Sequence, residues 1–247
     1  MVKQRRPVRI WSAAVLLLAV LALTLSESGM PFSLRLYART HGLSPADYPD
    51  ELVALYERNA DAREFVKEYP LRKNDAPEID LSGEVTPGEA PLLMQWDLRW
   101  GCRRYNENLM ALAGCGPTCM AMAYIKITGD ASYDPWTMAL FAEAHGFNVV
   151  GEGTSWSFFT EGAALLGLDS TPIPQDAQRV RDNLAVGNPI VCIMGPGDFT
   201  TTGHFILLTG EEDGRIRLND PNSVQNSEKL WDLETILNQT QAMWVLR

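Results

Sequence analysis

The first third of the chain carries its apolar positions in short groups separated by polar stretches. Residues 10–25 form an apolar run without a charged residue, and residues 33–42 predict a short connector. Pro49 then opens a helical pattern that places Leu52 and Leu55 on one side of a helix. This part of the chain is therefore expected to be helical.

Asn59 interrupts the helical pattern, and a second short helix carries Phe65 and Val66. This helix is expected to end before Pro70, because proline disfavours helical backbone in the residue that precedes it. Residues 73–91 mix prolines and glycines with acidic residues, which is typical of a linker. Since two short helices cannot bury a core alone, they are expected to pack on the following domain or to hold it away from a membrane.

The apolar positions become dense from residue 92 onward. The predicted helices each end at a glycine, and they cover the residues from Pro117 to Thr128 and the ranges 135–145, 157–166 and 176–185. The predicted strands cover residues 189–194, 204–209, 215–219 and 242–246. Helices followed by antiparallel strands form an α+β pattern.

A basic flank precedes the apolar run, which is typical of an export signal. Four basic residues stand before it, with no acid: Lys3, Arg5, Arg6 and Arg9. Residues 1–28 therefore predict a cleaved signal peptide or a retained signal-anchor helix, although a full span needs about twenty apolar residues. A buried core helix fits the basic cluster badly. A positive flank stays in the cytoplasm, so the remainder is expected to be extracytoplasmic.

Two more segments follow the signal. Residues 29–90, called the leader below, comprise the short helices and the linker, and residues 91–247 have the composition of one domain. Beyond the N-terminal basic cluster, the chain keeps 17 basic and 31 acidic residues. Such a surface repels phosphate backbones, so no nucleic-acid partner is expected. The oligomeric state is left open.

Four cysteines occur, and their spacing favours neither a disulfide scaffold nor a metal site. Cys115 and Cys119 are four residues apart, so a bridge between them along a helix would be strained. Cys119 and Cys192 are interpreted as small buried apolar residues, and the role of Cys102 stays open. No paired CxxC motif is present, and neither a metal nor a cofactor is expected.

Cys115 is the candidate nucleophile. Gly114 and Gly116 flank it and would let a substrate approach the backbone, and Pro117 suits the first turn of a helix. A thiol at a helix N-terminus has a lowered pKa, which favours the reactive thiolate. The alternative is a buried structural cysteine beneath a tight turn.

His204 is the candidate base among three histidines. His41 lies in the predicted connector, and His145 ends a predicted helix, where a capping role is expected. His204 follows Gly203 and begins an apolar strand, a position suited to line a cleft. Taken alone, a histidine at this position is more often structural.

Asp220 can join His204 through a hairpin. If Gly210 pairs with Gly214, His204 lies opposite Asp220, with Cβ atoms about 5 Å apart. A carboxylate beside an imidazole fixes its tautomer and stabilises the imidazolium. A slip of one residue would bring Asn219 there instead, and a plain Asp-Pro turn is the structural alternative.

Two more residues are candidates around the predicted cleft. The Gln95 amide and the Cys115 backbone N–H could donate to a developing oxyanion, although a surface glutamine is the simpler reading of spacing alone. Trp156, after a glycine-rich loop, could form a substrate wall, although a helix N-cap at Ser155 or Thr154 explains that loop equally well. Residues 200–202 are expected to form a lip of the cleft.

Four spaced motifs carry a resemblance to a known family. Residues 95–101 (QWDLRWG), 114–118 (GCGPT), 203–205 (GHF) and 219–221 (NDP) resemble the C39-like cysteine peptidases of the papain-like superfamily, in the same order. The upstream helical segment also resembles leaders of bacterial cell-surface members.

The resemblance implies a papain-like α+β fold in which the nucleophile lies at the N-terminus of a helix packed on an antiparallel sheet. It implies Cys115 as nucleophile, His204 as general base and acid, Asp220 as orienter and Gln95 in the oxyanion hole. The expected activity is hydrolysis of a peptide or protein substrate through a thioester. The alternatives are a peptide- or cell-wall-binding module, an acyl transferase with the same triad, or a thiol oxidoreductase that uses Cys115 and Cys119.

Overall fold

The computed structural model describes residues 29–151 and 153–247. The predicted signal peptide or anchor helix, residues 1–28, lies outside the described residues. Across the two described ranges, no helix combines the length and the apolar character needed to cross a membrane.

Helices dominate the first two thirds of the described chain, and the main strands follow. The leader helices are α2 (Phe32–Thr40), the short 3₁₀ helix η1 (Pro45–Asp47), α3 (Asp50–Arg58) and α4 (Arg63–Arg72). The domain helices are α5 (Met110–Ala113), α6 (Cys115–Thr128), α7 (Pro135–Ala144), η2 (Trp156–Phe159), α8 (Glu161–Leu165), α9 (Ala177–Ala185), α10 (Val224–Glu228) and α11 (Leu233–Leu237). The fully described range 73–103 contains neither helix nor strand.

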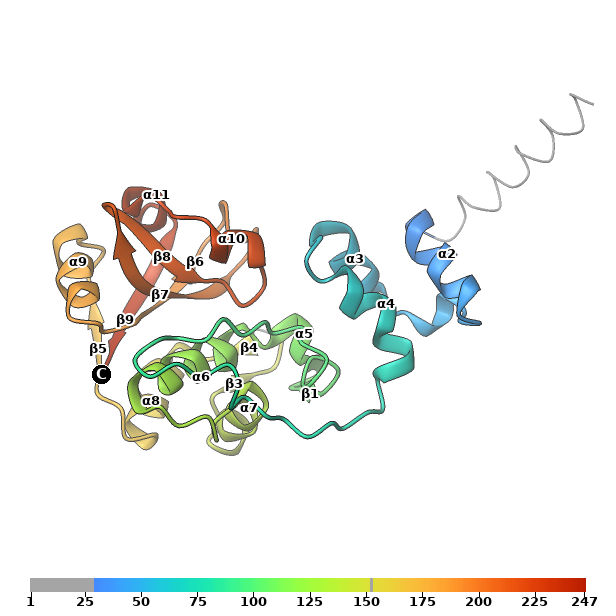
Figure 1. Ribbon diagram of the computed structural model, residues 1–247, viewed down its shortest axis with the longest axis horizontal. Coiled ribbons are helices and arrows are strands. Elements are labelled where there is room, and N and C mark those ends of the chain that lie inside the picture. The colour runs from blue at the N-terminus through green and yellow to red at the C-terminus, as the bar shows by residue number, and fades with distance from the viewer. Residues whose placement is uncertain (1–28, 152) are drawn as a thin grey trace, which may run out of the picture.

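One five-stranded antiparallel sheet organises the C-terminal half. Its strands are β5 (Ser170–Ile173), β6 (Ile190–Met194), β7 (His204–Glu212), β8 (Arg215–Asn219) and β9 (Thr240–Leu246), in the spatial order β5-β9-β6-β7-β8. Two short hairpins lie elsewhere, β1 (Arg104–Tyr105) with β2 (Asn108–Leu109) and β3 (Asn148–Val149) with β4 (Gly153–Thr154). Figure 1 shows α6, α7 and α8 gathered on one side of the sheet, with α9 and α11 away from these three helices.

Side chains from both faces of the central strands are buried. Val191 and Ile193 of β6 pack into the core shared with α6 and α7, while Ile190 and Cys192 pack into a second core with α9 and α11. A strand buried on both faces loses the apolar–polar alternation, which explains why β6 is apolar throughout. The resulting layers of helices and antiparallel sheet confirm the predicted α+β class.

Helix α6 passes through the main core. Nine of its 14 residues are buried, as expected for a largely apolar helix that lies inside a core. It ends at Gly129, whose φ of 73° is the left-handed conformation that glycine adopts without a steric cost. The centre of the molecule therefore holds the first residue of this helix, Cys115, in a fixed position.

Several predicted elements differ from the observed ones. The predicted connector at 33–42 is wrong, because helix α2 occupies it and buries Leu34 and Ala38 on one side. Helix α4 does not end before Pro70, which lies in its last turns, where proline removes only one hydrogen bond. The single helix predicted over 157–166 is split into η2 and α8.

The hairpin between β7 and β8 has a different register from the predicted one. Glu212 pairs with Arg215, so the turn contains two residues, Asp213 and Gly214, both with positive φ. Positive φ at both central residues is typical of a type I′ turn. The predicted pairing of Gly210 with Gly214 is wrong, and Gly210 pairs with Arg217.

The leader packs on the domain through an apolar core of its own. Leu34, Leu52 and Phe65 share this core with Leu109 and Ala111 of the domain. Gly101 makes the close contact possible, since a Cβ at this position would lie 2.7 Å from the Phe65 ring. The leader is therefore docked on the domain, one of the two arrangements that its sequence predicted.

Replacing Phe65 with alanine should destabilise the protein strongly. The side chain is 3% exposed, and truncation of a buried aromatic residue costs about 3–5 kcal/mol of unfolding free energy. Urea unfolding of the variant measures this loss. Phe32→Ala is the matched control, because Phe32 is 60% exposed and its loss should cost about 0.5 kcal/mol or less. Equal costs for both variants would contradict the proposed docking.

Candidate active site

Cys115 is the first residue of α6, and Gly114 precedes it as the N-cap. A side chain could not replace Gly114, because its Cβ would lie 2.5 Å from the carbonyl oxygen of Met110. The thiol is partly exposed, unlike the three other cysteines, which are buried. All four are free thiols. The sulfur therefore lies at the positive end of a 14-residue helix and remains accessible.

His204 is the first residue of β7 and pairs with Met194 at the end of β6. The imidazole is 6% exposed. Its Nε2 atom lies 2.7 Å from Oδ1 of Asp220, which leaves Nδ1 for the sulfur of Cys115. The His204 side chain, through its charge and hydrogen bonding, is the main group that lowers the pKa of the Cys115 thiol. The ring thus bridges a carboxylate and a thiol.

Asp220 is held at the end of β8 by a dense set of hydrogen bonds. Oδ1 accepts from the backbone N–H of Asn222 at 2.9 Å, and Oδ2 accepts from Nδ2 of Asn226 at 2.8 Å. The side chain is 1% exposed. Asp220 does not face His204 across a regular ladder, because the observed pairs end at Leu207 and Asn219. The turn that follows β8 brings the carboxylate to the imidazole.

The charges of these residues stabilise one another. Burial raises the pKa of the Cys115 thiol, but His204 and nearby backbone N–H groups together lower it by more, so the net pKa falls below its ordinary value. These N–H groups belong to Phe205 and Gly116. The arrangement therefore favours a thiolate over a thiol.

The imidazole shows the complementary shift. Burial lowers the pKa of His204, but the charge and hydrogen bond of Asp220, followed by those of Cys115, raise it to about 10. For Asp220, burial raises the pKa, but the imidazolium and the hydrogen bonds from Asn226 and Asn222 together lower it by more, so the carboxylate stays ionised. The favoured state is a thiolate–imidazolium pair backed by a carboxylate.

Gln95 is buried beside the same residues. Its Nε2 donates to the carbonyl oxygen of Ala111 at 2.8 Å, and its backbone N–H donates to Pro221 at 2.7 Å. Within residues 29–151 and 153–247, no acceptor binds the second hydrogen of the Nε2 amide, and Oε1 is buried without a hydrogen bond. The amide is thus placed between the α5 backbone and the loop after Asp220.

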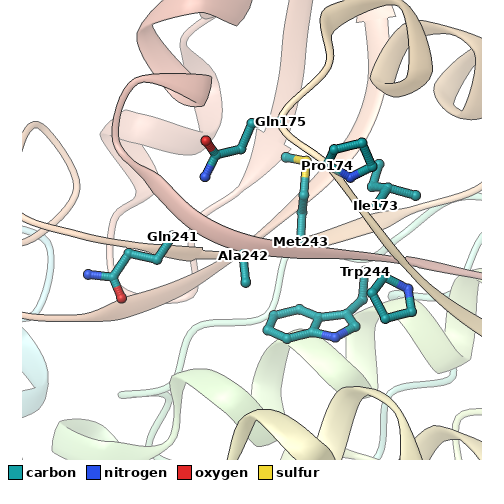
Figure 2. Close-up of a pocket in the computed structure, with 8 residues that line it drawn as sticks. Ile173, Pro174, Gln175, Gln241, Ala242, Met243 and Trp244 are labelled. Carbon is teal, nitrogen blue, oxygen red and sulfur yellow. The ribbon is translucent and has the colours of Figure 1, made fainter.

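A cleft of about 660 Å³ connects these groups. Gln95, Cys115, His204 and Asp220 all line it, together with residues 197–203. A second pocket lies between β9 and residues 172–175, as Figure 2 shows, with Trp244 and Met243 in its wall. Its lining contains no thiol, imidazole or carboxylate, so the acid–base and nucleophilic groups belong to the first cleft.

The other predicted site residues take different positions. Gly203 lines the cleft. Gly114 and Gly116 lie outside its lining, and a Cβ at Gly116 would lie 2.5 Å from Oγ1 of Thr154, which shows a packing role. Trp156 also lies outside the lining. Its ring packs edge-on against Trp244, with 6.1 Å between the ring centroids. Ser155 caps η2, as the simpler interpretation of the glycine-rich loop predicted.

The remaining histidines and cysteines are structural in the described chain. His145 is the C-cap of α7, as predicted, and its Nδ1 lies 2.8 Å from the carbonyl oxygen of Phe141. His41 stacks on Tyr37 at the end of α2. Burial raises the pKa of Cys119 well above its ordinary value, as it does for Cys192, so both thiols stay protonated and apolar.

Asn226 and Ser227 are site residues that sequence reasoning missed. Asn226 binds the carboxylate of Asp220, and Oγ of Ser227 accepts from the Asp220 backbone N–H at 2.9 Å. The available signal was a polar turn and short helix directly after the Asp-Pro pair, which is typical of side chains that bind nearby backbone. The leader residues that contact this turn have no comparable local signal.

Comparisons with known proteins agree with the motifs. The model of the Peptidase_C39 like family matches residues 89–246. No curated protein matches the chain. The peptidase domain of Streptococcus ComA, a bifunctional ABC transporter involved in a quorum-sensing pathway, is 19% identical with a TM-score of 0.41, over 54% of this chain and 90% of that domain. A C39-like peptidase from Bacillus anthracis is 15% identical with a TM-score of 0.40, over 66% of this chain and 97% of that one.

The family match covers most of the region that carries the site. It begins before Gln95 and ends with the last residue of β9, and it includes Cys115, His204 and Asp220. Because the match extends over residues 89–246, more than half of the sequence, the chain belongs to the Peptidase_C39 like family and contains a cysteine peptidase-like domain.

Proposed function

We propose that this protein is a cysteine peptidase that hydrolyses peptide bonds with Cys115 as nucleophile. The observation that supports it most directly is the sequence of contacts from the partly exposed Cys115 through His204 to the buried Asp220. An adjacent base and a third group that orients it are the general requirements for an activated nucleophile.

The first half of the reaction forms a thioester. The Cys115 thiolate attacks the carbonyl carbon of the peptide bond, and a tetrahedral oxyanion forms. The backbone N–H of Cys115 and the free hydrogen of the Gln95 amide donate to this oxyanion. His204, as imidazolium, gives its proton to the leaving amine, which departs while the C–S bond remains.

The second half of the reaction releases the acid. Neutral His204 takes a proton from a water molecule, whose oxygen attacks the thioester carbonyl. The C–S bond breaks, the carboxylic acid leaves, and the thiolate–imidazolium pair forms again. Asp220 holds the ring in one orientation through both steps and stays ionised.

The proposed place of action is outside the cytoplasm. The basic residues before position 10 and the apolar run that follows support export, with either a cleaved signal or a retained anchor. The substrate is then a peptide or protein in the extracytoplasmic space. Residues 197–203 and the leader turn around Asn59 line the cleft that would receive it.

A peptidyl vinyl sulfone is expected to label Cys115 alone, because this thiol combines a lowered pKa with exposure. The exported protein is treated near pH 6.5, and mass spectrometry identifies both the labelled peptide and the N-terminus. The controls are Cys102, where burial raises the pKa to about 11, and Cys192, which is fully buried. Labelling of either control in place of Cys115, or no labelling, would contradict the proposal.

A further inference from the structure

The turn between α3 and α4 forms part of the wall of the candidate active-site cleft. Arg58, Asn59 and Asp61 line the same cleft as Cys115 and His204. The turn does not fill it, since about 660 Å³ remains open and Cys115 stays partly exposed. Figure 1 shows α3 and α4 on the side of the domain that carries α5 and α10.

Two side chains of this turn hold the loop that follows Asp220. Nδ2 of Asn59 donates to the carbonyl oxygen of Asn222 at 2.6 Å and to its Oδ1 at 3.1 Å. Oδ2 of Asp61 accepts from the backbone N–H groups of Val224 at 2.8 Å and Gln225 at 3.2 Å. It also accepts from Oγ of Ser223 at 3.3 Å. More than 160 residues separate the partners in sequence.

The loop that the leader holds is the one that binds the Asp220 carboxylate. The backbone N–H of Asn222 donates to Oδ1 of Asp220, the same oxygen that contacts His204. The Asn226 side chain donates to Oδ2 of Asp220. Asn59 therefore contacts a residue that itself binds the carboxylate, and Asp61 holds the first turn of the helix that contains Asn226.

Contacts within the leader and with the domain support this turn. The turn is closed internally by a hydrogen bond from the Asp61 backbone N–H to Oδ1 of Asn59, at 3.0 Å. The helices on either side pack into the core that the leader shares with the domain, where Phe65 lies against Gly101. Trp96 adds a contact from the domain, since its Nε1 donates to Asn222 at 3.2 Å. The loop is thus held from two sides.

We propose that the leader is a permanent part of the active site, in which Asn59 and Asp61 act as positioning residues for Asp220. This inference rests on the proposed function for its catalytic meaning. The leader acts through the Asp220 loop on the orientation of His204 and does not block the cleft. Its removal would leave the backbone N–H groups of Val224 and Gln225 without their acceptor and loosen the carboxylate.

The test compares Asp61→Ala with Asp61→Asn in the full-length chain. Alanine removes the acceptor, whereas asparagine keeps an amide oxygen in its place, so Asn should restore what Ala loses. Asp61→Ala should lower kcat by between about tenfold and about a hundredfold, with a smaller change in KM, as small misplacements of catalytic groups do. Asp176→Ala is the matched control, since Asp176 caps α9 through the Arg179 N–H and lies outside the cleft lining.

A pH profile separates positioning from simple stability. Asp220 raises the pKa of His204 to about 10. Anionic iodoacetate is attracted by the imidazolium, so its rate of reaction with the Cys115 thiolate falls as the ring loses its charge, and a loosened carboxylate should move this alkaline limb of the alkylation rate to lower pH. A purely structural loss would leave this limb in place. Iodoacetate alkylation needs no peptide substrate, so it reports on Asp61 even if the wild-type chain fails to hydrolyse peptides, which would contradict only the proposed function.

The outcomes are distinct. The positioning role is supported if the alkaline limb moves to lower pH in Asp61→Ala and in Asn59→Ala. Asp61→Asn and Asp176→Ala should then behave like wild type. An unchanged limb in folded Asp61→Ala, or higher activity in that variant, would overturn it, and the second result would identify an inhibitory leader.

Discussion

Replacing Cys115 with alanine is expected to reduce peptide hydrolysis by about 10⁵-fold or more, the size found when a nucleophile is removed from a catalytic triad. Alanine removes the sulfur that forms the thioester, while Gln95 and the cleft remain available for binding. The loss should therefore appear in kcat, with KM close to the wild-type value. Initial rates on a peptide that the wild-type chain cleaves measure both constants.

Cys119→Ala is the matched control for this loss. Cys119 follows Cys115 by one helical turn, but it is fully buried and burial raises its pKa well above the ordinary value. Its replacement should leave kcat within a small factor of wild type. A similar loss in both variants would favour a reaction that uses two thiols, and full activity in Cys115→Ala would refute the proposed nucleophile.

The candidate site was predictable where its signals are local. Glycines around Cys115 and the proline after it predict that the thiol lies at or just before a helix N-terminus, and α6 begins at Cys115. The apolar run after His204 predicts a strand that begins with the imidazole, and β7 begins there. Both predictions depend only on neighbours in sequence, which is why a single chain was enough to make them.

The contact between His204 and Asp220 was predicted through an incorrect register. The Asp213–Gly214 pair forms a two-residue turn, and the pairing of β7 with β8 shifts its register between Leu208 and Gly210. Together these changes remove the direct pairing of the two residues. The contact survives because Asp220 leaves the strand and is turned toward the imidazole by its bonds to Asn222 and Asn226. Side-chain hydrogen bonds of this kind have no periodic pattern in sequence.

The contact between the leader and the loop after Asp220 could not be predicted from the sequence, because it depends on tertiary packing. Helix α2 buries only Leu34 and Ala38, which is too few apolar positions to mark a helix against a connector. Asn59 and Asp61 are ordinary turn residues until the leader core brings them to the loop after Asp220. Tertiary docking creates this function, so only the structure reveals it.

Replacing His204 with alanine is expected to lower peptide hydrolysis by about 10⁴-fold or more and to change how Cys115 reacts with pH. Burial raises the pKa of Cys115, and His204 is the main group that lowers it. Without the imidazole, the pKa should rise above the ordinary thiol value. In wild type the thiolate is present above the lowered pKa and is lost only as the pH falls through it, so alkylation should continue at acidic pH. In the variant, alkylation should require alkaline pH.

Iodoacetamide rates between about pH 5 and about pH 10 test this expectation. His145→Ala is the control, because the His145 ring is exposed and, within the part of the chain that the structure describes, its only hydrogen bond with the domain is the one to Phe141. An unchanged acid limb in His204→Ala would show that the helix N-terminus alone stabilises the thiolate, and the imidazole would then have no part in activating it.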